Sequence, residues 1–209
     1  YTHYSIAIRD AIANSINVVA VKCLTEITPR VGYNLAVKLG ISPLYNDEAL
    51  DVNQPLALGG ITDGVTNLEL AGAYAAIANQ GMYNEPKFYS RIEDQYGNVL
   101  IDNTPEPEQV LSAENAFLLT SAMEDVVTRG TGTMIDLGDM PVAGKTGTTS
   151  DYKDIWFVGY TPYYTCSVWG GYDNNADLPD GELYHNYHKV LWNSIMTRIH
   201  AELPAADFT

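Results

Sequence analysis

The sequence predicts an α+β fold in which a helical lobe is followed by an antiparallel sheet, with a terminal helix packed behind that sheet. Apolar residues recur at helical spacing through much of positions 1–140. Apolar runs typical of strands occupy 142–169, and a last helical pattern follows them. We therefore expect a single folding unit, with the helical lobe over about 1–140 and the sheet and terminal helix over about 141–203.

The helical lobe carries several helix-start signals. Ser5 stands where it can cap a first helix. Thr66 and Glu69 have the spacing of a capping box and open a helix rich in small residues. Ser112 precedes another helical pattern, which ends at Gly130. Between these last two helices, residues 87–101 are expected to form a hairpin with its turn at a Tyr-Gly-Asn sequence.

The strand patterns come after residue 141. A short strand begins at Val142, and residues 155–158 are apolar on both faces, as a central strand should be. Residues 164–168 alternate in character, which is typical of a strand with one covered face. The terminal helix is expected to pack on the sheet through an apolar row at four-residue spacing, formed by Leu191, Ile195 and Ile199.

Composition narrows the classes of partner. The chain has 11 Lys and Arg against 26 Asp and Glu, a formal net charge of −15. Such a surface repels phosphate backbones and anionic lipid heads, so we expect no nucleic-acid partner. No apolar run approaches the roughly 20 residues needed to cross a bilayer, so no membrane segment is expected in this chain. With no initiator Met and no signal peptide, the sequence reads as a piece of a longer protein.

The sharpest chemical signal is the run from Gly144 to Thr149, which reads Gly-Lys-Thr-Gly-Thr-Thr. On an exposed strand edge, Lys145 would place a cation beside a cleft and the threonines would offer hydroxyls to a carboxylate. Gly147 would leave room for an incoming peptide to add as a further strand. A nucleotide-binding loop is disfavoured because Asp139 stands where that motif needs glycine. A surface turn made of Gly and Thr remains the alternative.

A weaker signal is Ser15-Ile16-Asn17, at the end of an apolar helical pattern. Its hydroxyl and amide could lie on one side of a cleft, where they would relay protons and hold a substrate carbonyl. Taken alone, the pattern is far more typical of a capped helix end.

Together, Ser15-x-Asn17 and the later Lys-Thr-Gly at 145–147 resemble the penicillin-recognising serine enzymes, whose remaining motif is Ser-x-x-Lys. The resemblance is to the transpeptidase domain of class A (bifunctional) penicillin-binding proteins. It implies the fold shared by penicillin-binding proteins and serine β-lactamases, here as a partial transpeptidase domain over 1–209. The segments that carry it are 13–18, 56–60, 64–66, 71–81, 129–133, 143–149 and 154–162.

The resemblance also assigns roles to residues. Ser15 would be a proton relay, Asn17 would anchor the substrate amide, and Lys145 would shape the electrostatics of acylation. The ligand would be a peptidoglycan stem peptide ending in D-Ala-D-Ala, or a β-lactam. The residues implied to bind it are Thr146, Gly147, Thr148 and Thr131. No cofactor is implied.

A metal site is not expected. His185 and His188 lie three apart near Asp180 and Glu182, but no third ligand has convincing spacing. The two cysteines, Cys23 and Cys166, are expected to be buried free thiols, and they do not settle the redox compartment.

One motif of the resembled family is out of place. There, the Ser-x-x-Lys serine precedes Ser-x-Asn by several dozen residues, whereas this chain begins 14 residues before Ser15. The Ser-x-x-Lys that does occur, Ser150 to Lys153, directly follows the Lys-Thr-Gly run in a predicted turn, and we interpret it as a chance match. We therefore expect this chain alone to form no acyl-enzyme.

For the longer protein, the resemblance implies a serine-type D,D-transpeptidase that β-lactams inhibit. It also implies an upstream glycosyltransferase domain, a membrane anchor and a place on the extracytoplasmic face of the bacterial cell membrane. Two alternatives stay open. One is a serine β-lactamase-like hydrolase, and the other is a non-catalytic peptidoglycan-binding module.

Overall fold

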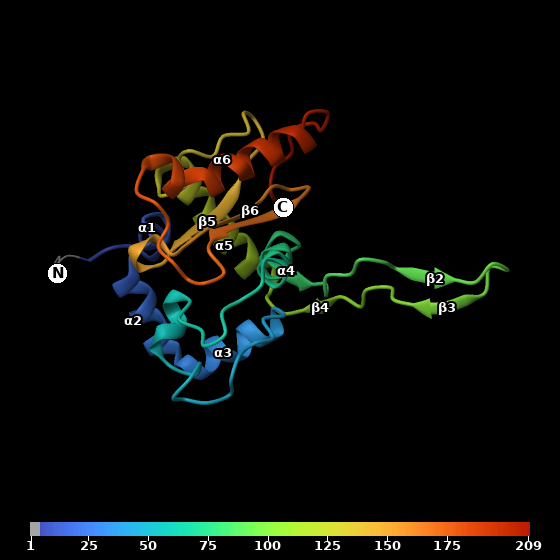
Figure 1. The fold of residues 1–209 in the computed structure, drawn as a ribbon, viewed down its shortest axis with the longest axis horizontal. Helices are drawn as coiled ribbons and strands as arrows, with labels where there is room; N and C mark the ends of the chain where they lie inside the picture. Colours follow the sequence, from blue (N-terminus) through green and yellow to red (C-terminus); the bar gives the residue numbers. More distant parts are fainter. Residues whose placement is uncertain (1–4) are drawn as a thin grey trace.

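A three-stranded antiparallel sheet forms the centre of the molecule in the computed structural model, which describes residues 5–209. The strands lie in the order β5-β6-β7, so that β6 is central (Figure 1). Every residue of β5 is paired in register with one of β6, from Ala143 opposite Tyr160 to Thr148 opposite Ile155. The strands are β5 (Ala143–Thr148), β6 (Asp154–Tyr160) and β7 (Thr165–Gly171).

Helices cover both faces of this sheet, because β6 is apolar on both. On one face, the ring of Phe157 packs edge-on against Trp192 at 5.1 Å between centroids. On the other, the hydroxyl of Tyr160 lies 2.7 Å from that of Thr120. The first face is covered by α6 (Glu182–Ile199), and the second by α4 (Asn67–Ala78) and α5 (Ala113–Arg129). The predicted α+β fold is confirmed.

The remaining elements flank these layers. Below the sheet in Figure 1, α2 and α3 lie next to one short 3-10 helix, η1. Four more strands form two separate pairs, β1 with β4 and β2 with β3. These elements are α1 (Ile8–Ala13), α2 (Asn17–Ile27), α3 (Pro29–Lys38), η1 (Gln54–Leu58), β1 (Met82–Tyr83), β2 (Arg91–Glu93), β3 (Val99–Asp102) and β4 (Glu108–Gln109).

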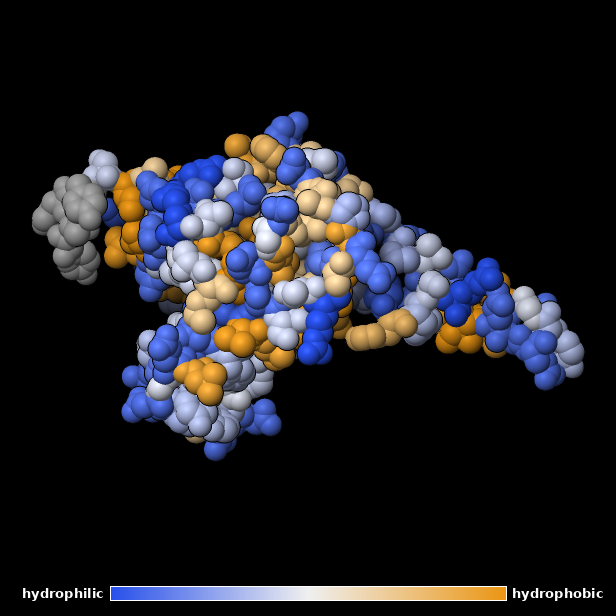
Figure 2. Space-filling model, turned by 90° about the horizontal axis from the view of Figure 1, so that it is seen from above, coloured by the Kyte–Doolittle hydropathy of each residue, from blue (hydrophilic) through white to orange (hydrophobic). Residues whose placement is uncertain are grey.

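The predicted hairpin is present as β2 and β3, and it projects from the body as a narrow arm (Figures 1 and 2). The turn is held by the carboxylate of Asp94, which accepts hydrogen bonds from the backbone of Tyr96 and Asn98. Gly97 takes the positive φ that this turn needs. Large apolar side chains of the arm, including Phe88 and Leu100, are exposed.

Several helix boundaries agree with the sequence. Thr66 and Glu69 form the expected capping box at α4, and Ser112 accepts a hydrogen bond from the Asn115 backbone at the start of α5. The prediction for Ser5 is wrong, because α1 begins at Ile8 after Ala7 and no side chain caps it.

The expected packing row of α6 is also wrong. Leu191, Ile195 and Ile199 are 47%, 39% and 47% exposed, whereas Trp192 and Met196 are fully buried. A helix carries several i, i+4 rows, and the row with the bulkier side chains turned inward. It is fixed there by the indole N–H of Trp192, which donates to the Cys166 carbonyl on β7 at 2.9 Å.

Cys23 and Cys166 are both free thiols, as expected, but each is half-buried and not fully enclosed. Among the helices of residues 5–209, none is long and apolar enough to span a membrane.

The capping box provides a test of the fold. Burial alone would raise the pKa of Glu69, but hydrogen bonds from Ser42 and Thr66 lower it to about 2. A carboxylate with a lowered pKa stabilises the folded state above its ordinary pKa and loses that effect as the pH falls toward 2. We expect Glu69→Gln to cost about 2 kcal/mol of unfolding free energy at pH 7 and progressively less below pH 4.5.

Urea unfolding at several pH values measures this difference. Glu106→Gln, at an exposed position in the loop before β4, is the matched control and should change little. A Glu69→Gln cost that stays constant down to pH 3 would contradict the account.

Candidate active site

Ser15 occupies a tight turn between α1 and α2. Its backbone N–H donates to the Ile12 carbonyl, and that of Ile16 donates to Ala11, which is the Schellman pattern of a helix end. The pattern places Ser15 in the left-handed region, with φ of 53°. Glycine is the usual residue there, because a side chain costs roughly 1 kcal/mol. The turn aims the Ser15 hydroxyl away from both helices and toward β5.

Lys145 of β5 meets that hydroxyl. Its ammonium donates to Ser15 Oγ at 2.8 Å and to the Thr146 carbonyl at 2.9 Å. The contact joins residues 130 positions apart in the sequence. It is the only hydrogen bond between the Ser-x-Asn and Lys-Thr-Gly segments found within residues 5–209. The structure therefore brings the two predicted motifs together.

Burial lowers the pKa of Lys145 to about 8. At pH 7, about nine-tenths of the molecules still carry the ammonium, and at pH 8 about half do. A lysine in this range can hold a positive charge near a ligand and can also exchange a proton with a neighbouring hydroxyl. The Ser15–Lys145 pair therefore has the properties of a short proton relay.

The threonines form a second cluster beside this pair. Thr131 and Thr146 hydroxyls lie 2.6 Å apart, and Thr148 follows two residues later on the same side of β5. We call Thr131, Thr146 and Thr148 the hydroxyl cluster. Because strand residues alternate, Lys145 points to the helical side of the sheet while the hydroxyl cluster lies on the side that α6 covers.

Gly130 explains how Thr131 reaches β5. A Cβ at Gly130 would lie 2.1 Å from the Ala13 carbonyl oxygen, so only glycine allows α5 to end against α1. That carbonyl accepts a hydrogen bond from the Thr131 backbone at 3.1 Å. The end of α1 therefore sets both Ser15 and Thr131, and the two halves of the site share one support.

Two adjoining cavities collect the predicted residues. One, of about 560 Å³, is lined by Ser15, Lys145 and Tyr74 of α4, with apolar side chains of α1 and α2 around them. The other, of about 530 Å³, is lined by the hydroxyl cluster and the first turns of α6. Asn17, the first residue of α2, lines both. The predicted residues that line the first cavity are Ser15, Asn17, Lys145, Thr146, Gly147 and Thr148.

Gly147 has a structural role in addition to the one predicted from the sequence. A Cβ there would come within 3.3 Å of Trp156 Cβ, its partner across the strand pair. The ring centroids of Trp156 and Trp169 lie 6.3 Å apart on this face. Both rings line a further hollow, which Lys145 also lines. The sequence predicted Trp156 only as part of the apolar run 155–158, and nothing in that run placed it beside the site.

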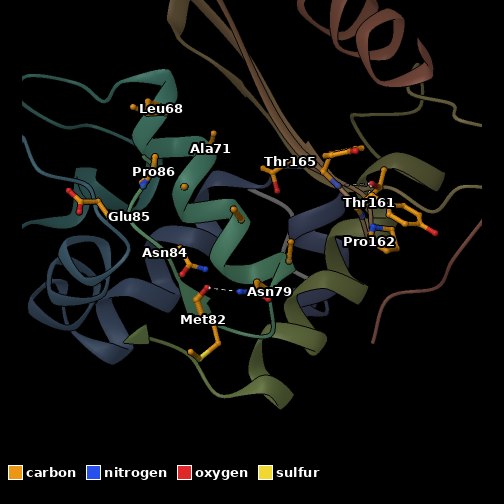
Figure 3. Close-up of a pocket in the computed structure, with 15 residues that line it drawn as sticks. Leu68, Ala71, Asn79, Met82, Asn84, Glu85, Pro86, Thr161, Pro162 and Thr165 are labelled. Atoms are coloured by element: carbon orange, nitrogen blue, oxygen red, sulfur yellow. Dashed lines mark hydrogen bonds between the residues drawn. The ribbon is translucent and has the colours of Figure 1, made fainter. Parts of the chain in front are cut away.

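A separate hollow lies on the far side of α4 (Figure 3). It is walled by Ala71 of α4, by Pro86 in the chain after β1, and by Thr161 and Pro162 in the turn between β6 and β7. None of the seven predicted site residues lines it. The predicted site residues therefore lie away from this hollow, around the edge of β5.

Comparisons with known proteins show the family of the chain. The sequence profile described as "Penicillin binding protein transpeptidase domain" matches residues 1–180. The chain belongs to the penicillin-binding protein transpeptidase family.

Relatives from several bacteria match over nearly the whole chain. Penicillin-binding protein 1A of Clostridium botulinum strain Hall is 39% identical over 198 residues, which are 94% of this chain and 23% of that protein. Penicillin-binding protein 1A of Aquifex aeolicus is 36% identical over 211 residues, 98% of this chain and 27% of that protein. The chain thus spans about a quarter of the length of these relatives.

Solved structures show the same fold. Penicillin-binding protein 1A from Haemophilus influenzae superposes with a TM-score of 0.82 at 21% identity, over 98% of this chain and 36% of that one. The PonA1 protein from Mycobacterium tuberculosis in complex with penicillin V gives 0.83 at 23% identity, over 100% of this chain and 60% of that one. The predicted family and its fold are therefore both confirmed.

The Ser-x-x-Lys sequence that occurs in this chain, Ser150–Lys153, lies in the turn between β5 and β6. That turn is a single 3-10 segment, η2 (Ser150–Tyr152), in which Asp151 and Tyr152 have positive φ. The ammonium nitrogen of Lys153 lies 3.9 Å from a carboxylate oxygen of Asp177. The segment is the turn that the sequence predicted.

The left-handed turn at Ser15 is testable with two substitutions that both remove the hydroxyl. Ser15→Gly relieves the backbone strain and Ser15→Ala does not, so Ser15→Gly should be more stable than Ser15→Ala by about 1 kcal/mol. Thermal unfolding of the two variants measures the difference. Equal stabilities would show that the φ of Ser15 carries no cost.

The pKa of Lys145 is testable by NMR. The side-chain ¹³Cε signal of Lys145 should titrate with a midpoint near pH 8, because burial disfavours the charged form. A Lys145 midpoint at the ordinary lysine value of about 10.4 would contradict the partial desolvation of the site.

Proposed function

We propose that this chain is the part of a peptidoglycan D,D-transpeptidase domain that binds the donor peptide and assists acyl transfer. The observation that carries the proposal is the 2.8 Å contact of Lys145 Nζ with Ser15 Oγ, beside the paired hydroxyls of Thr131 and Thr146. A proton relay and a carboxylate site thus meet at one strand edge. The longer protein would be a serine-type enzyme that cross-links stem peptides and is inhibited by β-lactams.

The hydroxyl cluster would bind the terminal carboxylate of a D-Ala-D-Ala peptide or the carboxylate of a β-lactam. Hydroxyl groups donate well to carboxylates, and the positive charge of Lys145 near by favours an anion. Within residues 5–209, β5 pairs with β6 alone, so its other edge can accept the peptide backbone as an added strand. Asn17, at the opposite wall, would hold the peptide's amide carbonyl.

The relay would serve the leaving group. When the peptide bond breaks, its nitrogen must gain a proton, and Ser15 Oγ–H can supply one that Lys145 replaces. The pKa of Lys145, about 8, makes this exchange accessible near neutral pH. The backbone N–H of Thr148 would contribute one donor to the oxyanion hole.

The nucleophile is proposed to be a Ser-x-x-Lys serine that this chain does not contain. Ser150 lacks the support such a serine needs, because it lies in a three-residue 3-10 turn and not at the start of an α-helix. Lys153, its potential base, lies 3.9 Å from Asp177. We therefore propose that the chain alone does not form an acyl-enzyme.

The setting of the longer protein is also a proposal. The Eggerthella lenta structure that shares this fold, with a TM-score of 0.64, is that of the D,D-transpeptidase domain of a peptidoglycan glycosyltransferase. By analogy, we propose an upstream glycosyltransferase domain, a membrane anchor and an extracytoplasmic location. No nucleic-acid partner is proposed, since the formal charge is −15.

Intact mass after exposure to penicillin tests the proposal. The experiment compares this chain with a longer version of the protein that contains the family's Ser-x-x-Lys. We expect a covalent adduct on the longer protein only, because acylation needs that serine. Lys145→Met in the longer protein should slow adduct formation by about a hundredfold or more, since it removes the relay and the charge.

Each alternative has its own outcome. An adduct on this chain at Ser150 would overturn the assignment of the nucleophile. No adduct on either protein would favour a peptidoglycan-binding module, and fast release of hydrolysed penicillin from the longer one would favour a β-lactamase-like hydrolase.

A further inference from the structure

The cavity on the α6 side of the site contains side chains that the proposed acylation does not use. It has a volume of about 530 Å³ and opens onto the hydroxyl cluster, Ser15 and Asn17. We call it the α6 pocket. Its wall on the helix side is formed by Glu182, His185, Asn186, His188 and Lys189.

Four of these five residues share one face of α6 because of their spacing, and His188 begins the adjoining buried row. Positions 182, 185, 186 and 189 follow the i, i+3, i+4, i+7 pattern of a single helix face. This pattern is polar, although an apolar row would be expected where a helix lies over a sheet. The polar stretch coincides with the cavity, and the buried row continues beyond it with Trp192 and Met196.

Two buried imidazole nitrogens in this wall have no partner. Within residues 5–209, no hydrogen-bonding group reaches His188 Nδ1 or His185 Nε2. His188 is only 2% exposed, and His185 is fixed by stacking on Tyr152 at 3.7 Å. An unpaired buried polar group costs about 1–3 kcal/mol, so a ligand that supplies a partner gains that free energy.

Charges of opposite sign stand at the two ends of the wall. Glu182 lies in the first turn of α6 and Lys189 two turns later, about 10 Å along the axis. Between them, His188 is neutral at pH 7, because burial, together with the charge of Lys189, lowers its pKa to about 4. A metal ion fits this wall poorly, since no group of three or more ligating His, Cys, Asp or Glu side chains occurs in the described residues.

The proposed acyl transfer produces a ligand with matching charges. Acylation breaks the peptide C–N bond and forms an ester C–O bond, and the proton lost by the nucleophile passes to the leaving nitrogen. The leaving group is therefore an amino acid with a free amine and carboxylate. At pH 7 its amine takes a further proton from water, so that it leaves as a zwitterion.

We propose that the α6 pocket binds this amino-acid leaving group, with its ammonium toward Glu182 and its carboxylate toward Lys189 and the hydroxyl cluster. The imidazoles of His185 and His188 complete its hydrogen bonds. The acyl acceptor must bring an amine to the same ester. It would bind in the same pocket and approach the ester along the path by which the leaving group departs. This inference rests on the proposed function, because that function supplies the ligand.

The test uses the chain itself and D-alanine as the probe. Long-range ¹H–¹⁵N spectra report the imidazole nitrogens of His185 and His188, and backbone amides report Thr146 and Thr148. We expect D-alanine to shift both sets of signals with one dissociation constant. N-acetyl-D-alanine lacks the ammonium and D-alaninamide lacks the carboxylate, so each should bind at least about tenfold more weakly.

Substitutions at the two charged ends of the pocket test its role, and each has a matched control elsewhere on the surface. Glu182→Gln and Lys189→Gln should each weaken D-alanine binding by about fivefold, the upper range for an exposed ion pair. Lys189→Arg should retain most of the affinity, because it keeps the charge. Glu202→Gln and Lys38→Gln, both exposed and outside the pocket lining, should have no effect. Glu182 is itself exposed, so its substitution is not expected to disturb folding.

The outcomes separate this inference from the proposed function. Shifts confined to Thr146 and Thr148, or equal binding of the three probes, would overturn the α6 pocket and leave the hydroxyl cluster in place. Absence of any shift would also overturn it. The penicillin adduct on the longer protein is measured independently, so its presence would preserve the proposed function in either case.

Discussion

The burial of β6 on both faces is the constraint on which the rest of the structure depends. Ile155 and Phe157 face α6, while Val158 and Tyr160 face the helical side, and each is at most 2% exposed. A strand of this kind needs cover above and below, so α6 must lie on one face and α4 with α5 on the other. Because β6 takes the centre, β5 is left at an edge. Alternation along that edge then directs one lysine to the helical layer and the threonines to the layer of α6.

This separation gives the site its two chemical halves. The contact between Ser15 and Lys145 belongs to the helical layer, where partial burial lowers the pKa of the lysine to about 8. The hydroxyl cluster belongs to the opposite layer, where it opens into a polar cavity. Met123 in α5 packs in the hydrophobic cluster of Tyr160, on the helical side of the sheet. Ile135, a few residues after α5, packs in the cluster of Trp192 on the α6 side, so the chain crosses from one layer to the other between them. Thr131 lies at this crossing and so touches β5 from its edge.

Local chemistry predicted much of this arrangement, and tertiary choices account for the rest. The capping box at Thr66, the cap at Ser112 and the continuous apolar run of β6 act within a few residues, so the sequence contains them fully. The inward row of α6 depends on which of two apolar rows meets the sheet, and that is decided by the fit of Trp192 against Phe157. The distance from Ser15 to Lys145 likewise follows from packing between segments 130 positions apart. The motif spacing indicated a family, but the geometry came only with the fold.

The left-handed turn at Ser15 has a consequence for protein engineering. A procedure that selects each residue for folding stability would choose glycine at this position, as it would at most helix ends of this kind. It would thereby delete the hydroxyl on which Lys145 rests. Thermostable versions of this domain should therefore be designed with position 15 held as serine, and the stability gained elsewhere, for instance along the exposed arm of β2 and β3.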